Sequence, residues 1–66
     1  MKAITFKITF YATKADFKKK KMTESLEGYE TKKIALDYAK IFSESNEYDV
    51  IVVTSSDKSF TKILTN

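Results

Sequence analysis

The stretch from Thr31 to Asn46, TKKIALDYAKIFSESN, is the part of this chain with a clear helical period. At about 100° per residue its apolar side chains fall on one arc of a helix, and its charged side chains fall opposite. The arc consists of Ile34, Ala35, Tyr38, Ala39, Ile41 and Phe42, with Leu36 on its flank. Thr31 is suited to cap the first turn, since its hydroxyl can accept a hydrogen bond from a free backbone N–H group. A helix this short is marginal alone in water, so we expect the apolar arc to be covered by a sheet.

The segments on either side of this stretch carry strand patterns. In Lys2–Thr13 apolar residues alternate with polar ones, which is typical of a strand with one face toward a core. The alternating apolar residues are Ile4, Phe6, Ile8 and Phe10. Tyr48–Thr54 contains an unbroken run of β-branched residues, which favours a strand covered on both faces. A turn over Ser55–Ser59 then leads to a short last strand, Phe60–Leu64.

The segment Lys18–Leu26 can be interpreted in two ways. We favour a second strand paired with the first, with a turn over Thr13–Phe17 before it and a turn at Gly28 leading into the helix. The alternative is an irregular basic loop over Lys14–Glu30, although such long connections are uncommon in small domains. With the first interpretation, residues 1–66 form a single α+β domain. We predict a two-layer sandwich in β-β-α-β-β order, with one helix packed on a three- to four-stranded, mostly antiparallel sheet.

The composition argues against most kinds of catalysis. The chain contains neither cysteine nor histidine, which excludes thiolate and imidazole metal ligands and the usual nucleophile–histidine pairs. A single glycine argues against a glycine-rich phosphate loop. We therefore expect no enzyme activity, no metal and no cofactor. No apolar run approaches the length of a membrane span, and no signal-peptide pattern opens the chain, so we expect a cytoplasmic protein.

The second half of the chain carries a pattern that resembles small proteins of bacteriophages and mobile elements. Its residues are Tyr29, Glu30 and Thr31, then Ala35, Tyr38, Ala39 and Lys40, then Tyr48, Asp49 and Val50. In the proteins that it resembles, an aromatic-x-Thr sequence precedes a short helix with A-x-x-Y-A-K, and a Tyr-Asp strand follows. The resemblance implies a small β-β-α-β-β fold and a phage-type accessory protein, and it implies no particular activity.

The outward face of the sheet is the first candidate binding surface. We expect Tyr11, Ile51 and Val53 to share this face. Leu36, on the flank of the helical arc, either caps the edge of the core or is a further contact with a partner. Contiguous exposed apolar surface on a soluble protein usually marks an interface, although long lysine stems can also cover such a face. The function that we predict is therefore non-catalytic binding of a protein partner or a second copy of the chain. A phage accessory factor of this kind would inhibit or redirect a host component by occlusion or strand addition.

A run of lysines is the second candidate surface. The chain has a net charge of +3, and its basic residues are all lysine. The lysines in question are Lys18, Lys19, Lys20 and Lys21, with Lys7 and Lys14 as expected neighbours. Such a patch could contact phosphates without sequence preference, so the alternative function is non-specific nucleic-acid binding. The other interpretation is a solvated edge strand, in which lysine discourages aggregation.

Overall fold

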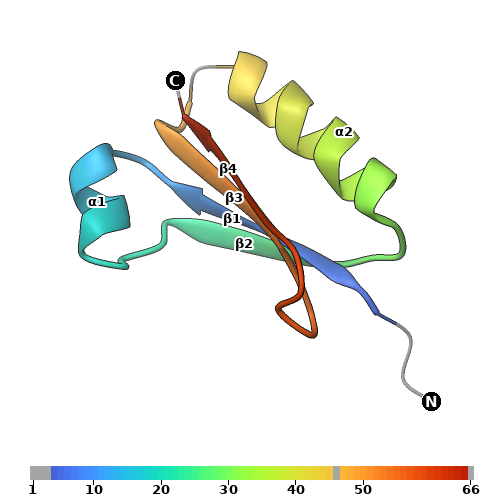
Figure 1. The fold of residues 1–66 in the computed structure, drawn as a ribbon. Helices are drawn as coiled ribbons and strands as arrows, with labels where there is room; N and C mark the ends of the chain where they lie inside the picture. The colour runs from blue at the N-terminus through green and yellow to red at the C-terminus, as the bar shows by residue number, and fades with distance from the viewer. Residues whose placement is uncertain (1–3, 46, 66) are drawn as a thin grey trace.

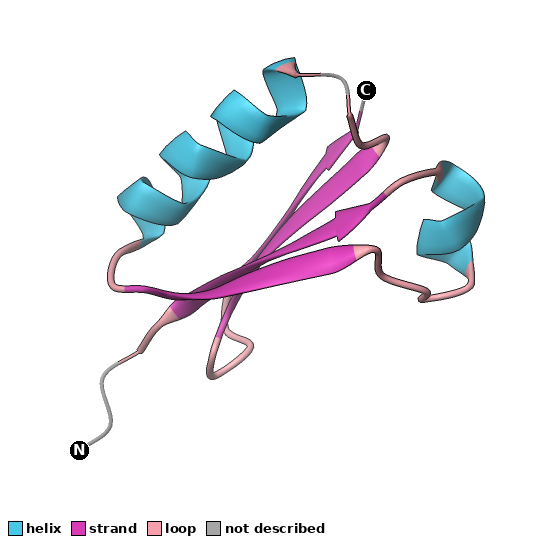
Figure 2. Ribbon diagram, turned by 180° about the vertical axis from the view of Figure 1, so that it is seen from behind, coloured by secondary structure: helices cyan, strands magenta, loops and turns pink. Residues whose placement is uncertain are grey.

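The computed structural model describes residues 4–45 and 47–65, which form a four-stranded sheet and two helices (Figure 1). The elements are β1 (Phe6–Tyr11), α1 (Lys14–Lys18), β2 (Glu24–Tyr29), α2 (Lys32–Glu44), β3 (Val50–Ser55) and β4 (Thr61–Thr65). The strands lie in the order β2-β1-β3-β4, and every neighbouring pair is antiparallel. The longer helix, α2, lies across one face of the sheet, and α1 lies at one end of β1 and β2, away from α2 (Figure 2). The predicted α+β class, with one main helix packed on an antiparallel sheet, is confirmed.

The core lies between α2 and the two central strands. Alternation along β1 points Ile8 and Phe10 toward α2, where both are buried. The register places Val53 opposite Ile8 and Ile51 opposite Phe10, so β3 presents these residues to the same face. From α2 the core receives Ala35 and Ala39, and partly buried side chains surround this centre. The surrounding set is Phe6, Leu26, Tyr29, Leu36, Phe42, Tyr48, Phe60 and Leu64.

The helix α2 begins where its sequence predicts. Thr31 is the N-cap, and its side-chain oxygen accepts a hydrogen bond of 3.2 Å from the backbone N–H of Ile34. Ser45 is the C-cap, so the helix is shorter than the predicted range of 31–46, and position 46 lies outside the described residues. The strand β1 is likewise shorter than the predicted Lys2–Thr13, whose first two residues also lie outside the described part of the chain.

The prediction of a second strand over Lys18–Leu26 is wrong for the first part of that segment. Residues Lys14–Lys18 form α1, which Thr13 caps by accepting a hydrogen bond of 3.1 Å from the backbone N–H of Asp16. Of the four consecutive lysines, Lys18 is the last residue of α1 and the other three lie in the loop after it. The strand β2 begins only at Glu24. The element order is therefore β-α-β-α-β-β, with one more helix than predicted.

The prediction of a turn at Gly28 is also wrong. Gly28 lies within β2, at an irregularity in the pairing of β2 with β1 between Phe6 and Ile8. Its φ of +92° is one that residues with a side chain rarely adopt, so this irregular position suits the one glycine of the chain. The chain continues as a strand to Tyr29 before it turns into α2.

The predicted grouping of Tyr11, Ile51 and Val53 on the outward face is wrong as well. Ile51 is 1% exposed and Val53 is fully buried, both beneath α2. Tyr11 follows Phe10 and pairs with Val50, so its side chain lies on the opposite face of the sheet. In an unbroken run of β-branched residues the sequence does not show which side chains face the helix. The pairing of β3 with β1 decides it.

Candidate functional site

Three large apolar side chains of α2 remain exposed. Ile34 is 41% exposed, Tyr38 is 47% exposed and Ile41 is 60% exposed. At spacings of four and three residues, these side chains lie on one flank of the helix, and we call them the α2 stripe. Together with Asp37 they line a shallow groove. The expectation that the sheet covers the whole apolar arc of the helix is therefore wrong.

The position of the α2 stripe follows from the small residues beside it. Ala35 and Ala39 are fully buried, so the helix contacts the sheet through its smallest side chains. Tyr38 precedes Ala39 by one residue, which turns it about 100° around the helix axis from the buried direction. The predicted arc is too wide for one contact with a sheet, so the flank that carries the larger residues faces solvent. The width of the arc is the sequence signal that could have revealed this surface.

Tyr38 is held in place by a second aromatic ring. Tyr29, at the end of β2, lies with its ring centroid 5.4 Å from that of Tyr38 and with an angle of 38° between the ring planes. Partial burial raises the pKa of Tyr29, and the neighbouring Tyr38 raises it further. This contact connects the α2 stripe to the edge strand β2 and restricts the motion of its central side chain.

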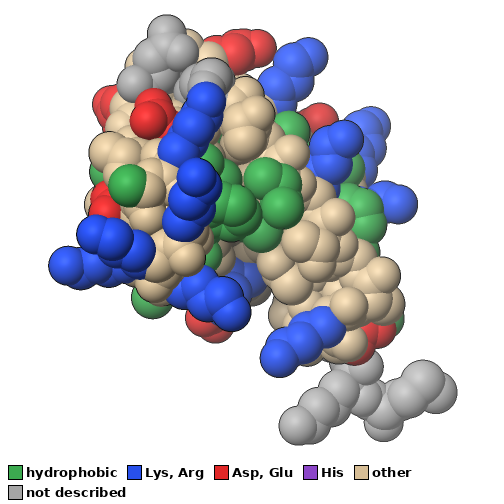
Figure 3. Space-filling view, turned by 60° about the vertical axis from the view of Figure 1, so that its left-hand side comes forward, with side chains coloured by type: hydrophobic (Ala, Val, Ile, Leu, Met, Phe, Trp, Pro, Cys, Tyr) green, Lys and Arg blue, Asp and Glu red, His purple; other side chains and the backbone are tan. Residues whose placement is uncertain are grey.

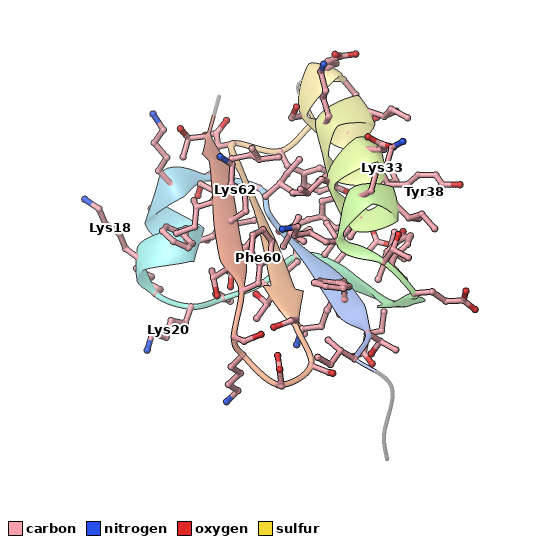
Figure 4. All side chains as sticks on the ribbon, turned by 45° about the vertical axis from the view of Figure 1, so that its right-hand side comes forward. Lys18, Lys20, Lys33, Tyr38, Phe60 and Lys62 are labelled. Atoms are coloured by element: carbon pink, nitrogen blue, oxygen red, sulfur yellow. The ribbon has the colours of Figure 1, made fainter. Side chains whose placement is uncertain are left out.

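A strip of alternating charges runs along α2 beside the stripe. It consists of Lys33, Asp37, Lys40 and Glu44, all exposed. Figure 4 shows that Lys33 and Tyr38 both point away from the sheet. Within the described part of the chain, the α2 stripe and this charged strip are exposed even though Tyr38 contacts Tyr29.

The opposite flank of α2 is covered by contacts with the rest of the protein. Leu36, for which the sequence allows either a partner contact or a place at the edge of the core, is only partly exposed and packs against the core. The ammonium nitrogen of Lys32 lies 5.1 Å from the centroid of the Phe60 ring, a cation–π arrangement that covers this side of the helix. Of the four residues predicted to bind a partner, Leu36, Ile51 and Val53 therefore contribute to the core.

Tyr11 lies on the other side of the molecule, next to α1. Its ring meets that of Phe17 edge to face, with the centroids 5.1 Å apart. Both side chains are partly buried by this contact. Ile63 of β4, which pairs with Val52, lies on the same face of the sheet and is 48% exposed. Figure 3, which turns the α1 side of the molecule forward, shows lysine side chains around an exposed apolar patch.

The six predicted nucleic-acid contacts do not form a single patch. Lys14 and the four consecutive lysines, Lys18–Lys21, are exposed on α1 and the loop after it. Figure 4 shows Lys18 and Lys20 pointing into solvent from this end of the molecule. Lys7 lies on the same sheet face as Tyr11 but four residues away along β1, which corresponds to about 13 Å. With Lys58 it lines a hollow at the other end of the sheet, beside Glu27.

Neither a cluster of potential metal ligands nor a membrane-spanning helix is found among the described residues. Within residues 4–45 and 47–65, no group of three or more acidic side chains is placed to hold a metal ion. No described helix is both long enough and apolar enough to cross a membrane.

Comparison with known proteins assigns no function to these surfaces. Models of known protein families, curated protein sequences and solved structures give no match to this chain.

Proposed function

We propose that this protein is a non-catalytic binding protein that acts through protein–protein contact, with the α2 stripe as its docking surface. The observation that carries the proposal is the exposure of Ile34, Tyr38 and Ile41 on a capped helix. Keeping three large apolar side chains in water is unfavourable by roughly 25 cal/mol per Å² of apolar surface, and a partner would remove that surface from water.

The stripe has the features of a protein-binding surface centred on an aromatic residue. Tyrosine is enriched among the residues that contribute most to binding energy, and Tyr38 lies between the two isoleucines. Its contact with Tyr29 reduces the entropy that Tyr38 would lose on binding. A partner would dock along α2 by helix-in-groove or helix–helix packing. The resemblance to phage accessory proteins adds the proposal that docking blocks a surface of a host component.

Photo-cross-linking in bacterial cells tests this function. A photoreactive amino acid in place of Ile41 should give a discrete adduct with a protein, and the substitution Ile34→Asp in the same chain should abolish that adduct. The same amino acid in place of Ile63, which is exposed on the far side of the sheet, is the matched control. Equal adducts from both positions, or no adduct from position 41, would contradict the proposal.

A second candidate function is non-specific nucleic-acid binding at the α1 end of the molecule. The observation that favours it is the exposure of Lys14 and Lys18–Lys21 beside the Tyr11–Phe17 aromatic pair. Lysines near aromatic rings combine attraction to phosphates with stacking on bases.

Titration of a fluorescent single-stranded oligonucleotide at several salt concentrations tests this second function. The logarithm of the association constant should fall linearly with the logarithm of the salt concentration. The expected slope is about −0.7 for each phosphate contacted. The double substitution Lys18→Glu and Lys20→Glu should remove binding. Lys33→Glu with Lys62→Glu, which makes the same change in net charge elsewhere, should weaken it much less. The absence of a complex at low salt would end this candidate.

A further inference from the structure

The charged strip of α2 carries positive and negative side chains in alternating order. From the N-terminal end of the helix it reads plus, minus, plus, minus, at Lys33, Asp37, Lys40 and Glu44. Spacings of three and four residues place these side chains in one row, directly beside the α2 stripe. A row of this kind becomes complementary to itself when its direction is reversed.

We propose that two copies of this chain associate through α2, with the two helices antiparallel and the α2 stripes in contact. This inference depends on the proposed function, because it names a second copy of the chain as the protein that docks on the stripe. A twofold axis near Tyr38 brings the same flank of both helices together. Lys33 of one copy then lies opposite Glu44 of the second copy, and Asp37 lies opposite Lys40.

The apolar residues fit the same arrangement. The charge pairs place the twofold axis between positions 38 and 39, so the two Tyr38 side chains meet near the axis. Ile34 of one copy and Ile41 of the second copy are then offset along the helix axis by two residues. This offset corresponds to about 3 Å. Side chains offset by this amount interdigitate when two helices pack. A parallel twofold pair would instead place the two charged strips on opposite sides of the contact, where they could not pair.

The edge strand beside the stripe does not favour a continuous sheet between the copies. β2 carries Glu24 and Glu27 and no lysine, so pairing it with itself would bring like charges together. The contact is therefore limited to the helices. α2 has 13 residues, and such a short helix pair buries less surface than a stable protein interface needs, so we expect a weak dimer.

Sedimentation equilibrium of the full chain, from about 10 μM to about 1 mM, tests the association. We expect a monomer–dimer equilibrium that Ile41→Asp abolishes and that Ile63→Asp, an exposed control on the far side, leaves unchanged. Because Ile41 is exposed, the variant should keep the circular dichroism spectrum of the original protein. A monomer throughout this range, or a dimer unaffected by Ile41→Asp, would overturn the inference. An adduct between position 41 and a different protein would leave the proposed function intact in that case.

Charge reversal tests the pairing of the two helices. Lys33→Glu and Glu44→Lys should each raise the dissociation constant about tenfold, because each creates two like-charge pairs in a twofold dimer. The double variant, with both reversals in one chain, should restore association. The two positions are eleven residues apart on the helix, so rescue cannot come from a contact within one copy. Failure of the rescue would overturn the antiparallel arrangement.

Disulfide trapping tests the direction independently, since the chain has no cysteine of its own. A mixture of Lys33→Cys and Glu44→Cys chains should form a mixed disulfide on mild oxidation. Each variant alone should cross-link far more slowly, because identical positions lie about 16 Å apart along antiparallel helices. The reverse result, with rapid cross-linking of each variant alone, would contradict the antiparallel arrangement and overturn the inference.

Discussion

Asp57 organises the turn between β3 and β4 through its carboxylate. One of its oxygens accepts hydrogen bonds from the hydroxyls of Ser55 and Ser59, both at 2.7 Å, and from the backbone N–H of Ser59 at 3.0 Å. These hydrogen bonds lower the pKa of Asp57 from 3.8 to about 2. The next residue, Lys58, has a φ of +62°, which is uncommon for a residue with a side chain. The carboxylate therefore supports a turn whose backbone is locally unfavourable.

This pKa predicts a specific loss of stability in acid. The folded chain holds the Asp57 proton less tightly than the unfolded chain, so its carboxylate stabilises the fold at pH values above about 4. That contribution should disappear as the pH falls from about 4 toward 2. The free energy of unfolding of the original protein should therefore exceed that of Asp57→Asn at neutral pH, and denaturant titrations should show the difference shrinking below pH 4. A difference independent of pH would contradict this role.

The two helices depend on different features of the sequence and the structure. α2 has both a helical period and a threonine cap, and its first turn forms as the sequence predicts. α1 has five residues, which is too short for a periodic pattern, and none of its residues is buried. It depends instead on the cap at Thr13 and on the contact of Phe17 with Tyr11, which is made only after β1 is in place. The run of lysines after α1 makes this helix difficult to predict from the sequence pattern.

The contribution of the N-cap of α2 to stability should be measurable. Thr31→Ala leaves the backbone N–H of Ile34 without its partner, so the free energy of unfolding should fall by about 1 kcal/mol. Thr31→Asp keeps an oxygen that can accept this hydrogen bond and places a negative charge at the helix N-terminus, so it should retain the stability. Chemical denaturation of both variants measures the effect. Equal losses in the two variants would show that the threonine contributes through something other than capping.

The molecule as a whole has one well-covered sheet face and one that is only partly covered. α2 covers the side that holds Ile51 and Val53, whereas the far side leaves Ile63 about half exposed. A chain of this length buries a small core, so each fully buried side chain matters for stability. The exposed α2 stripe lies at the boundary of that core, which is why docking there should not disturb the fold.

The contrast between the two faces can be measured directly. Ile51→Ala should lower the free energy of unfolding by about 2–5 kcal/mol, because it leaves a cavity among buried side chains. Ile63→Ala removes the same atoms from a half-exposed site and should cost less than about 1 kcal/mol. Thermal or denaturant unfolding of the two variants compares them. Similar losses would mean that the far face is covered in solution.

Features that depend only on neighbouring residues can be predicted from the amino-acid sequence alone. The helical period and Thr31 specify α2, alternation specifies the buried face of β1, and the absence of histidine and cysteine limits the chemistry. These features are local, since one turn of helix or one pair of residues in a strand is enough to define them.

Contacts between distant parts of the chain determine which side of each ambiguous element is buried. The run Val50–Val53 fits either face until β1 sets its register, and the wide apolar arc of α2 became part core and part surface only when the alanines met the sheet. The stretch that starts at Thr31 therefore both organises the core and carries the candidate docking surface. A sheet can cover only part of the circumference of one helix, and which part it covers depends on contacts between residues far apart in the sequence.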